Sequence, residues 1–269
     1  PATLWAFNHA IAYVPEIDAY LDGTSELAGL GELPALDQGA MVLRFGVLGD
    51  TGDPELTVIP YQPAGANRVA SKGTYRIGAD GHARVRLQES VGGTQAPEIR
   101  RTFQDVSRRK EILSRLLAQQ HAGAQLEDVT FRHLSDLGVP VEIELTARLP
   151  DFARPDGGEL VVPLDADPES LLHRFGAWTE RKHDLLLDHP FSESVSMRFA
   201  LPADARAEAL PAPIDLQTPF GRYTQTVTPA PSGFQLEGLL VIDAARVTAA
   251  DYPAFRRFLG AVVSARRAT

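Results

Sequence analysis

Apolar and polar residues alternate with a period of two along much of the chain, and a helical period of three to four appears in only two long stretches. Alternation places every second side chain on the same face of a strand, whereas the longer period marks one face of a helix. The pattern therefore predicts a chain of the α+β class that is mainly β, with many short strands and few helices.

Two hairpins are predicted in the first hundred residues. Apolar residues 4–14 end at Pro15, and residues 18–22 follow after a short polar turn, which indicates two paired strands. The second hairpin joins residues 68–78 to residues 82–91 through Asp80-Gly81, a dipeptide that favours a tight turn between alternating runs. Polar residues dominate both of these later strands, so we expect one face of their sheet to meet solvent.

Two helices carry local start signals. The first is predicted over residues 105–121, with Asp105 as its N-cap. The second opens with Thr248-Ala-Ala-Asp251, a capping box in which Asp replaces the usual Glu. Apolar residues at helical spacing follow this box and predict one buried helix face: Tyr252, Phe255, Phe258, Leu259, Val262 and Val263.

Two stretches rich in Gly, Pro and Asp, residues 49–54 and 150–158, divide the chain into three parts. The first part is 1–48, and the second is a β-rich accessory region with one helix, 49–150. Short strands at regular intervals in the third part, 151–269, predict a β-sandwich closed by the C-terminal helix. The second and third parts can alternatively form one continuous accessory region.

Composition excludes several classes of protein. The chain has 26 basic and 35 acidic residues and a net charge of −9, which argues against a nucleic-acid partner. No run approaches the roughly 20 apolar residues of a membrane span, and 44% hydrophobic residues are enough to form a core. The absence of Cys excludes disulfides, thiolate metal ligands and a Cys nucleophile in this sequence.

His9 and Asp22 are the most specific candidate site. They stand thirteen residues apart on the two strands of the first predicted hairpin, where they can lie side by side. A carboxylate in this position orients an imidazole and stabilises its cationic form, and the imidazole can then deprotonate a nucleophile. The alternative interpretation makes His9 a core residue of a strand and Asp22 a turn former.

The sequence around this pair reads FNHAIAYVPEIDAYLDGT and is followed by Gly31-Glu-Leu-Pro34 and Asp37-Gln38-Gly39. It resembles the second half of the bacterial transglutaminase-like fold, a papain-like cysteine enzyme family, in members flanked by β-rich domains of unknown function. Weaker similarity continues in residues 100–117, 134–141 and 252–256. The resemblance implies that His9 is a general base and that Asp22 is its orienting carboxylate.

The same resemblance implies a Cys nucleophile ahead of His9, which this sequence lacks. Because the chain opens at Pro1 in the middle of an apolar pattern, we expect a fragment. The first functional hypothesis is therefore the C-terminal fragment of a transglutaminase-like cysteine acyltransferase, amidase or peptidase that is inactive alone. Its partners would be the Cys-bearing upstream half of the same protein and a protein or peptide substrate. The resemblance also implies a periplasmic or extracellular location.

The second functional hypothesis is a non-catalytic β-sandwich module for adhesion or interaction at the cell surface. Neither hypothesis calls for a cofactor or a metal. A possible metal set, His183, Asp184, Asp188 and His189, lies in one short segment. On a strand its two histidines share one face and its two aspartates share the other, so the spacing favours a polar edge over a metal site.

Overall fold

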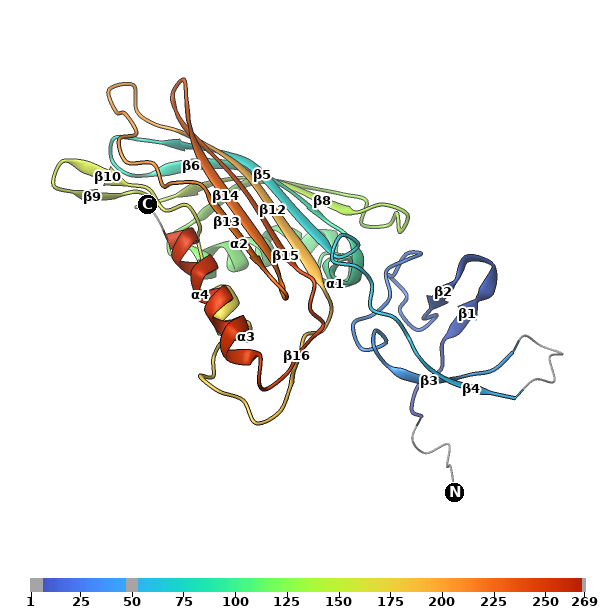
Figure 1. Cartoon of the computed structure of the whole chain (residues 1–269). Coiled ribbons are helices and arrows are strands. Elements are labelled where there is room, and N and C mark those ends of the chain that lie inside the picture. Colours follow the sequence, from blue (N-terminus) through green and yellow to red (C-terminus); the bar gives the residue numbers. More distant parts are fainter. Residues whose placement is uncertain (1–6, 47–52, 268–269) are drawn as a thin grey trace.

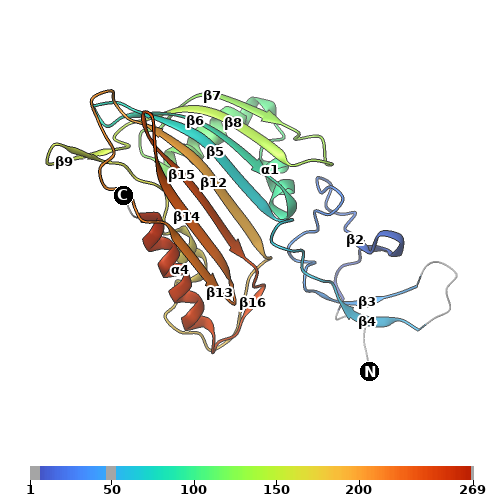
Figure 2. The same ribbon diagram turned by 45° about the horizontal axis from the view of Figure 1, so that its top comes forward.

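The computed structural model describes residues 7–46 and 53–267. At its centre is a sheet of eight strands, shown in Figures 1 and 2. In chain order they are β5 (Arg68–Ile77), β6 (Ala83–Val91), β7 (Gln125–Arg132), β8 (Val141–Leu149), β12 (Phe191–Ala200), β13 (Ile214–Thr218), β14 (Gly221–Ala230) and β15 (Gly233–Ile242).

The spatial order of these strands is β13-β14-β15-β12-β5-β6-β8-β7. All neighbours are antiparallel except β5 and β12, which run parallel with Arg68 opposite Ser192. The remaining strands form two-stranded sheets: β1 (Ala12–Val14) with β2 (Ala19–Leu21), β3 (Met41–Arg44) with β4 (Glu55–Val58), β9 (Arg154–Asp156) with β10 (Glu159–Val161), and β11 (Leu185–Leu186) with β16 (Arg246–Val247).

The helices are α1 (Ala96–Thr102), α2 (Arg109–Gln120), α3 (Ser170–Phe175) and α4 (Tyr252–Arg267), with single 3-10 turns at Pro15–Ile17, Gly93–Gln95 and Val106–Arg108. The α+β, mainly β class predicted from the sequence is therefore confirmed. Among the described residues, none of these helices is long and apolar enough to cross a membrane.

One face of the large sheet is covered by helices and the other is open to solvent. On β6, Val85 points into the core while its neighbours Arg84 and Arg86 are exposed. Leu113 and Leu117 of α2 pack on the same buried face. The solvent-exposed face predicted for the second hairpin is confirmed, and segregation of helices to one face is typical of α+β folds.

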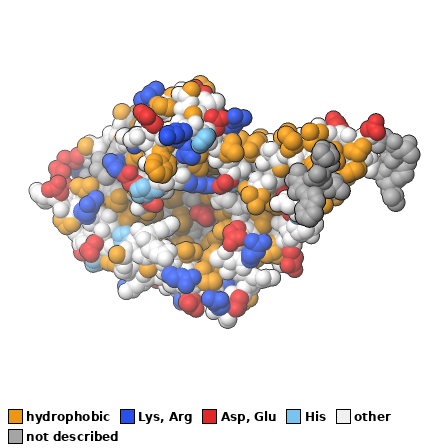
Figure 3. All heavy atoms as spheres, turned by 90° about the horizontal axis from the view of Figure 1, so that it is seen from below, with side chains coloured by type: hydrophobic (Ala, Val, Ile, Leu, Met, Phe, Trp, Pro, Cys, Tyr) orange, Lys and Arg blue, Asp and Glu red, His pale blue; other side chains and the backbone are white. Residues whose placement is uncertain are grey.

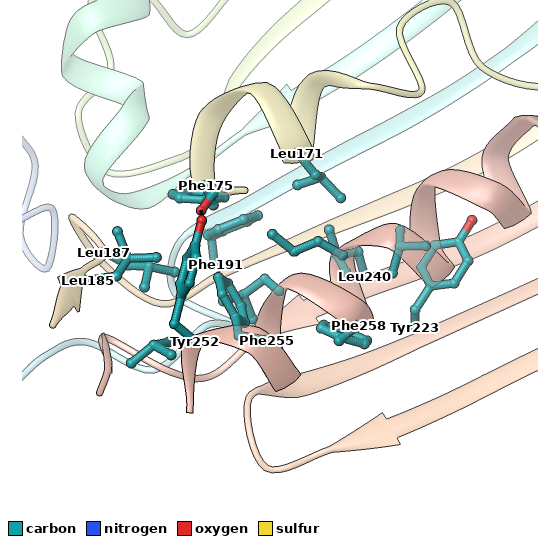
Figure 4. Packing of buried hydrophobic residues seen from close by; sticks show 14 of the residues in the cluster. Leu171, Phe175, Leu185, Leu187, Phe191, Tyr223, Leu240, Tyr252, Phe255 and Phe258 are labelled. Carbon is teal, nitrogen blue, oxygen red and sulfur yellow. Dashed lines mark hydrogen bonds between the residues drawn. The ribbon is translucent and has the colours of Figure 1, made fainter. Parts of the chain in front are cut away.

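The C-terminal helix is held as its sequence predicts. The hydroxyl of Thr248 donates to Asp251 Oδ2 over 2.7 Å and accepts the Asp251 backbone N–H over 3.1 Å, which satisfies a helix-terminal donor. Behind this cap all six apolar residues predicted for the buried face of α4 are buried. Figure 4 shows Tyr252 and Phe255 directed toward Phe175 of α3 and Phe191 of β12.

The structure departs from the predicted C-terminal sandwich. Strands from both sides of residue 150 form one sheet, because β12 adds in parallel to β5 instead of joining a second sheet. Alternation in β12, β14 and β15 specifies one buried face, but α3 and α4 cover that face in place of a facing sheet. This arrangement corresponds to the continuous accessory region that the sequence left open as an alternative.

The first part of the chain also runs past residue 48, since β3 pairs with β4 from Met41↔Val58 to Arg44↔Glu55. The stretch predicted as a linker, 49–54, falls between these paired strands, and its residues 49–52 lie outside the described residues. In Figures 1 and 2 the part that contains β1 to β4 lies beyond the end of the large sheet, next to α1.

A buried arginine joins these two parts. The Arg100 side chain on α1 has no exposed surface and forms an ion pair with Glu32. Its guanidinium also donates to the carbonyls of Leu27 (2.9 Å) and Val139 (3.0 Å), and Glu32 accepts the Gly29 backbone N–H. The carboxylate and the two carbonyls together compensate a cation that is removed from water.

A chain of buried amides forms a second connection. Gln38 Nε2 donates to the Thr94 hydroxyl over 2.9 Å, and that hydroxyl donates to Asn67 Oδ1 over 2.8 Å. Asn67 Nδ2 in turn donates to the Pro190 carbonyl. Gln38 and Asn67 are 4% and 1% exposed, so each unmade bond would carry the cost of an unsatisfied buried group.

We expect Arg100→Met to lower the free energy of unfolding by about 3–5 kcal/mol, because it leaves the Glu32 carboxylate buried without its cation. Urea denaturation followed by circular dichroism measures this change. Arg101→Met is the matched control on the same helix, since the Arg101–Glu98 pair is exposed and such pairs contribute only about 0.2–0.5 kcal/mol. Equal losses in the two variants would contradict a special role for the buried pair.

Candidate functional site

The short hairpin of β1 and β2 positions both predicted site residues. Its strands pair from Ala12↔Leu21 to Val14↔Ala19, and the turn between them closes with Asp18 in the left-handed region at φ 47°. His9 precedes β1 and Asp22 follows β2, so both residues stand at the open end of the hairpin, away from its turn.

The structure brings His9 and Asp22 together. His9 Nε2 lies 3.2 Å from Asp22 Oδ1, and the two side chains are 40% and 6% exposed. With Nε2 directed at the carboxylate, Nδ1 is the ring nitrogen that can accept a proton from another group. The pair therefore combines a buried orienting carboxylate with an imidazole that is accessible from outside.

The Asp22 carboxylate is fixed by its own turn. Its Oδ1 accepts the backbone N–H of Thr24 over 2.9 Å and the Thr24 hydroxyl over 2.8 Å. Burial alone would raise the pKa of Asp22, but these two hydrogen bonds and the contact with His9 outweigh it and lower the pKa. The turn thus keeps Asp22 ionised beside the imidazole.

Asp37 is a third ionisable group at this site, and the sequence interpretation gave it no role. One ligand atom from each of His9, Asp22 and Asp37 lies within 4.8 Å of the other two. Asp37 is 8% exposed, and its Oδ2 has no hydrogen-bond partner among the described residues. Burial, followed by the negative charge of Asp22, raises the pKa of Asp37 against an opposing effect of His9.

The residues after Asp37 explain its fixed position. Gln38 is held in the buried amide chain to Thr94, and Gly39 adopts φ +73°. A Cβ atom on Gly39 would lie 2.3 Å from the Tyr61 ring, so the close approach and the backbone angle both require glycine. In the sequence, the motif Asp37-Gln38-Gly39 marks this segment. The motif alone does not predict that the Asp37 side chain lies beside His9.

The segment 183–189 does not gather its four polar residues. Asp184 binds Arg246 and the Ala249 backbone N–H, whereas Asp188 pairs with Arg174. His183 is exposed, and His189 is buried with no hydrogen-bond partner for either ring nitrogen among the described residues. Burial lowers the pKa of His189, and the positive charge of Arg174 lowers it further. The negative charge of Asp188 acts in the opposite direction.

We expect Thr24→Val to raise the pKa of Asp22, because it removes the hydroxyl that donates to Oδ1. A pH titration of the Asp22 carboxyl carbon by NMR measures the shift. Thr24→Ser is the control, since it keeps both the hydroxyl and the backbone N–H. The explanation fails if the Val and Ser variants titrate at the same pH.

We expect the chain to lose stability as the pH falls below about 6.5, the ordinary pKa of histidine, because the lowered pKa of His189 favours the neutral ring in the folded state. A single such group adds at most ~1.4 kcal/mol per pH unit to the slope. Thermal unfolding between pH 7 and 5 measures it, and His189→Leu should flatten the curve. His183→Leu is the exposed control, and an unchanged slope in His189→Leu would refute the assignment.

Comparison with known proteins gives limited matches. Residues 166–269 match the family model of DUF3858, a "Domain of Unknown Function with solved-structure structure", which spans α3, α4 and β11 to β16. No curated protein matches the chain. A solved structure of a "putative protease" from Parabacteroides distasonis is 18% identical, with a TM-score of 0.31. The match covers 34% of this chain and 18% of the chain of that protein. This likeness is too slight to show a shared fold.

Proposed function

We propose that the segment carrying His9 and Asp22 is the base-bearing half of a transglutaminase-like cysteine acyltransferase, amidase or peptidase. The 3.2 Å contact between Nε2 of the partly exposed His9 and Oδ1 of the buried Asp22 carries this proposal. A buried carboxylate that fixes one ring nitrogen leaves the other free to act as a general base. The resemblance of the surrounding sequence to the transglutaminase-like family supports the same role.

In the proposed reaction a Cys thiol from the complementary half gives its proton to His9 Nδ1, and its sulfur attacks an amide carbonyl. The imidazolium, stabilised by Asp22, returns the proton to the departing amine as the C–N bond breaks. A thioester remains, and water or a second amine resolves it. Because this sequence contains no Cys, the chain alone is inactive in this proposal.

Exposed apolar side chains in the part that contains β1 to β4 support a complementary half. Large hydrophobic residues of the part that contains β1 to β4 are 53–93% exposed: Leu30, Leu36, Met41, Phe45, Leu56 and Val58. Figure 3 shows apolar atoms gathered on the part that contains β1 to β4, at the right of the view. A two-stranded sheet is marginal in water without a further layer, so we propose that the Cys-bearing half packs on these side chains. The periplasmic or extracellular location belongs to the same proposal.

The test is co-expression of this chain with a Cys-bearing half of the transglutaminase-like fold, encoded upstream of it. We expect the joined protein to react with iodoacetamide at that Cys and to cleave or transfer a peptide amide. His9→Ala should remove this activity, and Asp22→Asn should reduce kcat by orders of magnitude, as loss of the orienting carboxylate does in other triads.

His82→Ala is the matched control, because His82 also lies near two aspartates, Asp80 and Asp151, but on the exposed surface. It should leave the activity unchanged. A joined protein that folds but reacts with no electrophile, or one in which His9→Ala is fully active, would overturn the proposed function.

A further inference from the structure

The cluster of His9, Asp22 and Asp37 contains more acceptor capacity than its hydrogen bonds use. Asp22 Oδ1 is occupied by Thr24 and His9, whereas Asp37 Oδ2 has no partner among the described residues. Both carboxylates approach the same imidazole, with one ligand atom of each residue within 4.8 Å of the others. The His9–Asp22 interaction needs only one carboxylate, so it does not explain why Asp37 is buried beside it.

The unpartnered oxygen of Asp37 points to a missing positive group. Asp37 is 8% exposed, and its buried Oδ2 has given up water without gaining a hydrogen-bond partner among the described residues. Such a group is costly unless it is neutralised, paired or bound to a metal ion. Among the described residues no Lys or Arg forms an ion pair with it; the negative charge of Asp22 acts on it, and His9 is the group that opposes this effect.

The spacing of the three groups suits a small cation. A tetrahedral Zn²⁺ holds N and O ligands at about 2.0–2.2 Å, which places neighbouring ligand atoms about 3.4 Å apart. The His9–Asp22 distance of 3.2 Å is close to this value, and Asp37 offers a ligand atom within 4.8 Å of both. One imidazole and two carboxylates form a donor set for first-row divalent ions such as Zn²⁺ or Mn²⁺.

We propose that His9, Asp22 and Asp37 together bind a divalent transition-metal cation, with Zn²⁺ as the probe that tests it. The partial exposure of His9 leaves the ion open to solvent on one side. The sequence predicts no metal site, since its one candidate segment, 183–189, favours a polar edge. The proposed site lies elsewhere, at His9, Asp22 and Asp37. A cation on His9 Nε2 would replace the contact of this nitrogen with Asp22 Oδ1, so the cation-bound form would lack the oriented imidazole that the proposed base requires.

This inference does not rest on the proposed function, because metal binding is measured on the present chain without any nucleophile. Isothermal titration calorimetry with ZnCl₂ should detect binding of a single Zn²⁺ at the cluster. His9→Ala and Asp37→Asn should each weaken it by at least about tenfold, since even residues outside the ligand shell change metal affinity by that much. EDTA should reverse the rise in Tm that Zn²⁺ causes in the wild-type chain.

His82→Ala is the control for surface binding, since His82 lies 3.9 and 3.8 Å from carboxylate oxygens of Asp80 and Asp151. It should bind Zn²⁺ as the wild type does. Co²⁺ added in place of Zn²⁺ should give visible absorption bands that Asp37→Asn alters, and circular dichroism checks that this variant is folded. Absence of Zn²⁺ binding, or equal affinity in the wild type and in the folded His9→Ala and Asp37→Asn variants, would overturn the proposal.

Discussion

A fully buried guanidinium determines how the two parts of this molecule meet. Arg100 is shielded from water, and its hydrogen bonds reach Glu32 and the carbonyls of Leu27 and Val139. A cation in this position is tolerated only if all its acceptors stay in place. The loop through residues 27–33 is therefore fixed against α1, and the hairpin that carries His9 and Asp22 is attached to this loop.

The geometry of the site follows from the same junction. Gln38 enters the buried amide chain through Thr94 and Asn67, and its neighbour Asp37 enters the cluster with His9 and Asp22. Asp22 has a local support of its own, the turn at Thr24. One carboxylate is thus positioned by three consecutive residues of sequence. The other is positioned through Gln38, whose partners lie just before β5 and just after β6. The two acids differ accordingly in the direction of their pKa shifts.

Local signals were sufficient for several elements. The capping box and the six-residue apolar stripe define α4, and Asp80-Gly81 defines the turn between β5 and β6. The helix α1 has only seven residues and no apolar period, so its sequence pattern does not predict a helix. This helix nevertheless carries Arg100. Alternation identified β12 as a strand but not its neighbour, because pairing with β5 depends on residues far apart in sequence. The sequence assigns Asp37 no candidate role, because neither its burial nor its proximity to His9 is encoded in a sequence spacing.

The parallel pairing of β5 with β12 also has a consequence for how the chain folds during synthesis. The edge of β5 that receives β12 remains unpaired until residues 191–200 have left the ribosome, after β6, β7 and β8 are complete. Such pairing between distant segments is slow to form, and an open strand edge in the meantime is a template for aggregation. Until the C-terminal half of the chain is made, a sheet built from β5 to β8 alone would leave this edge of β5 unpaired.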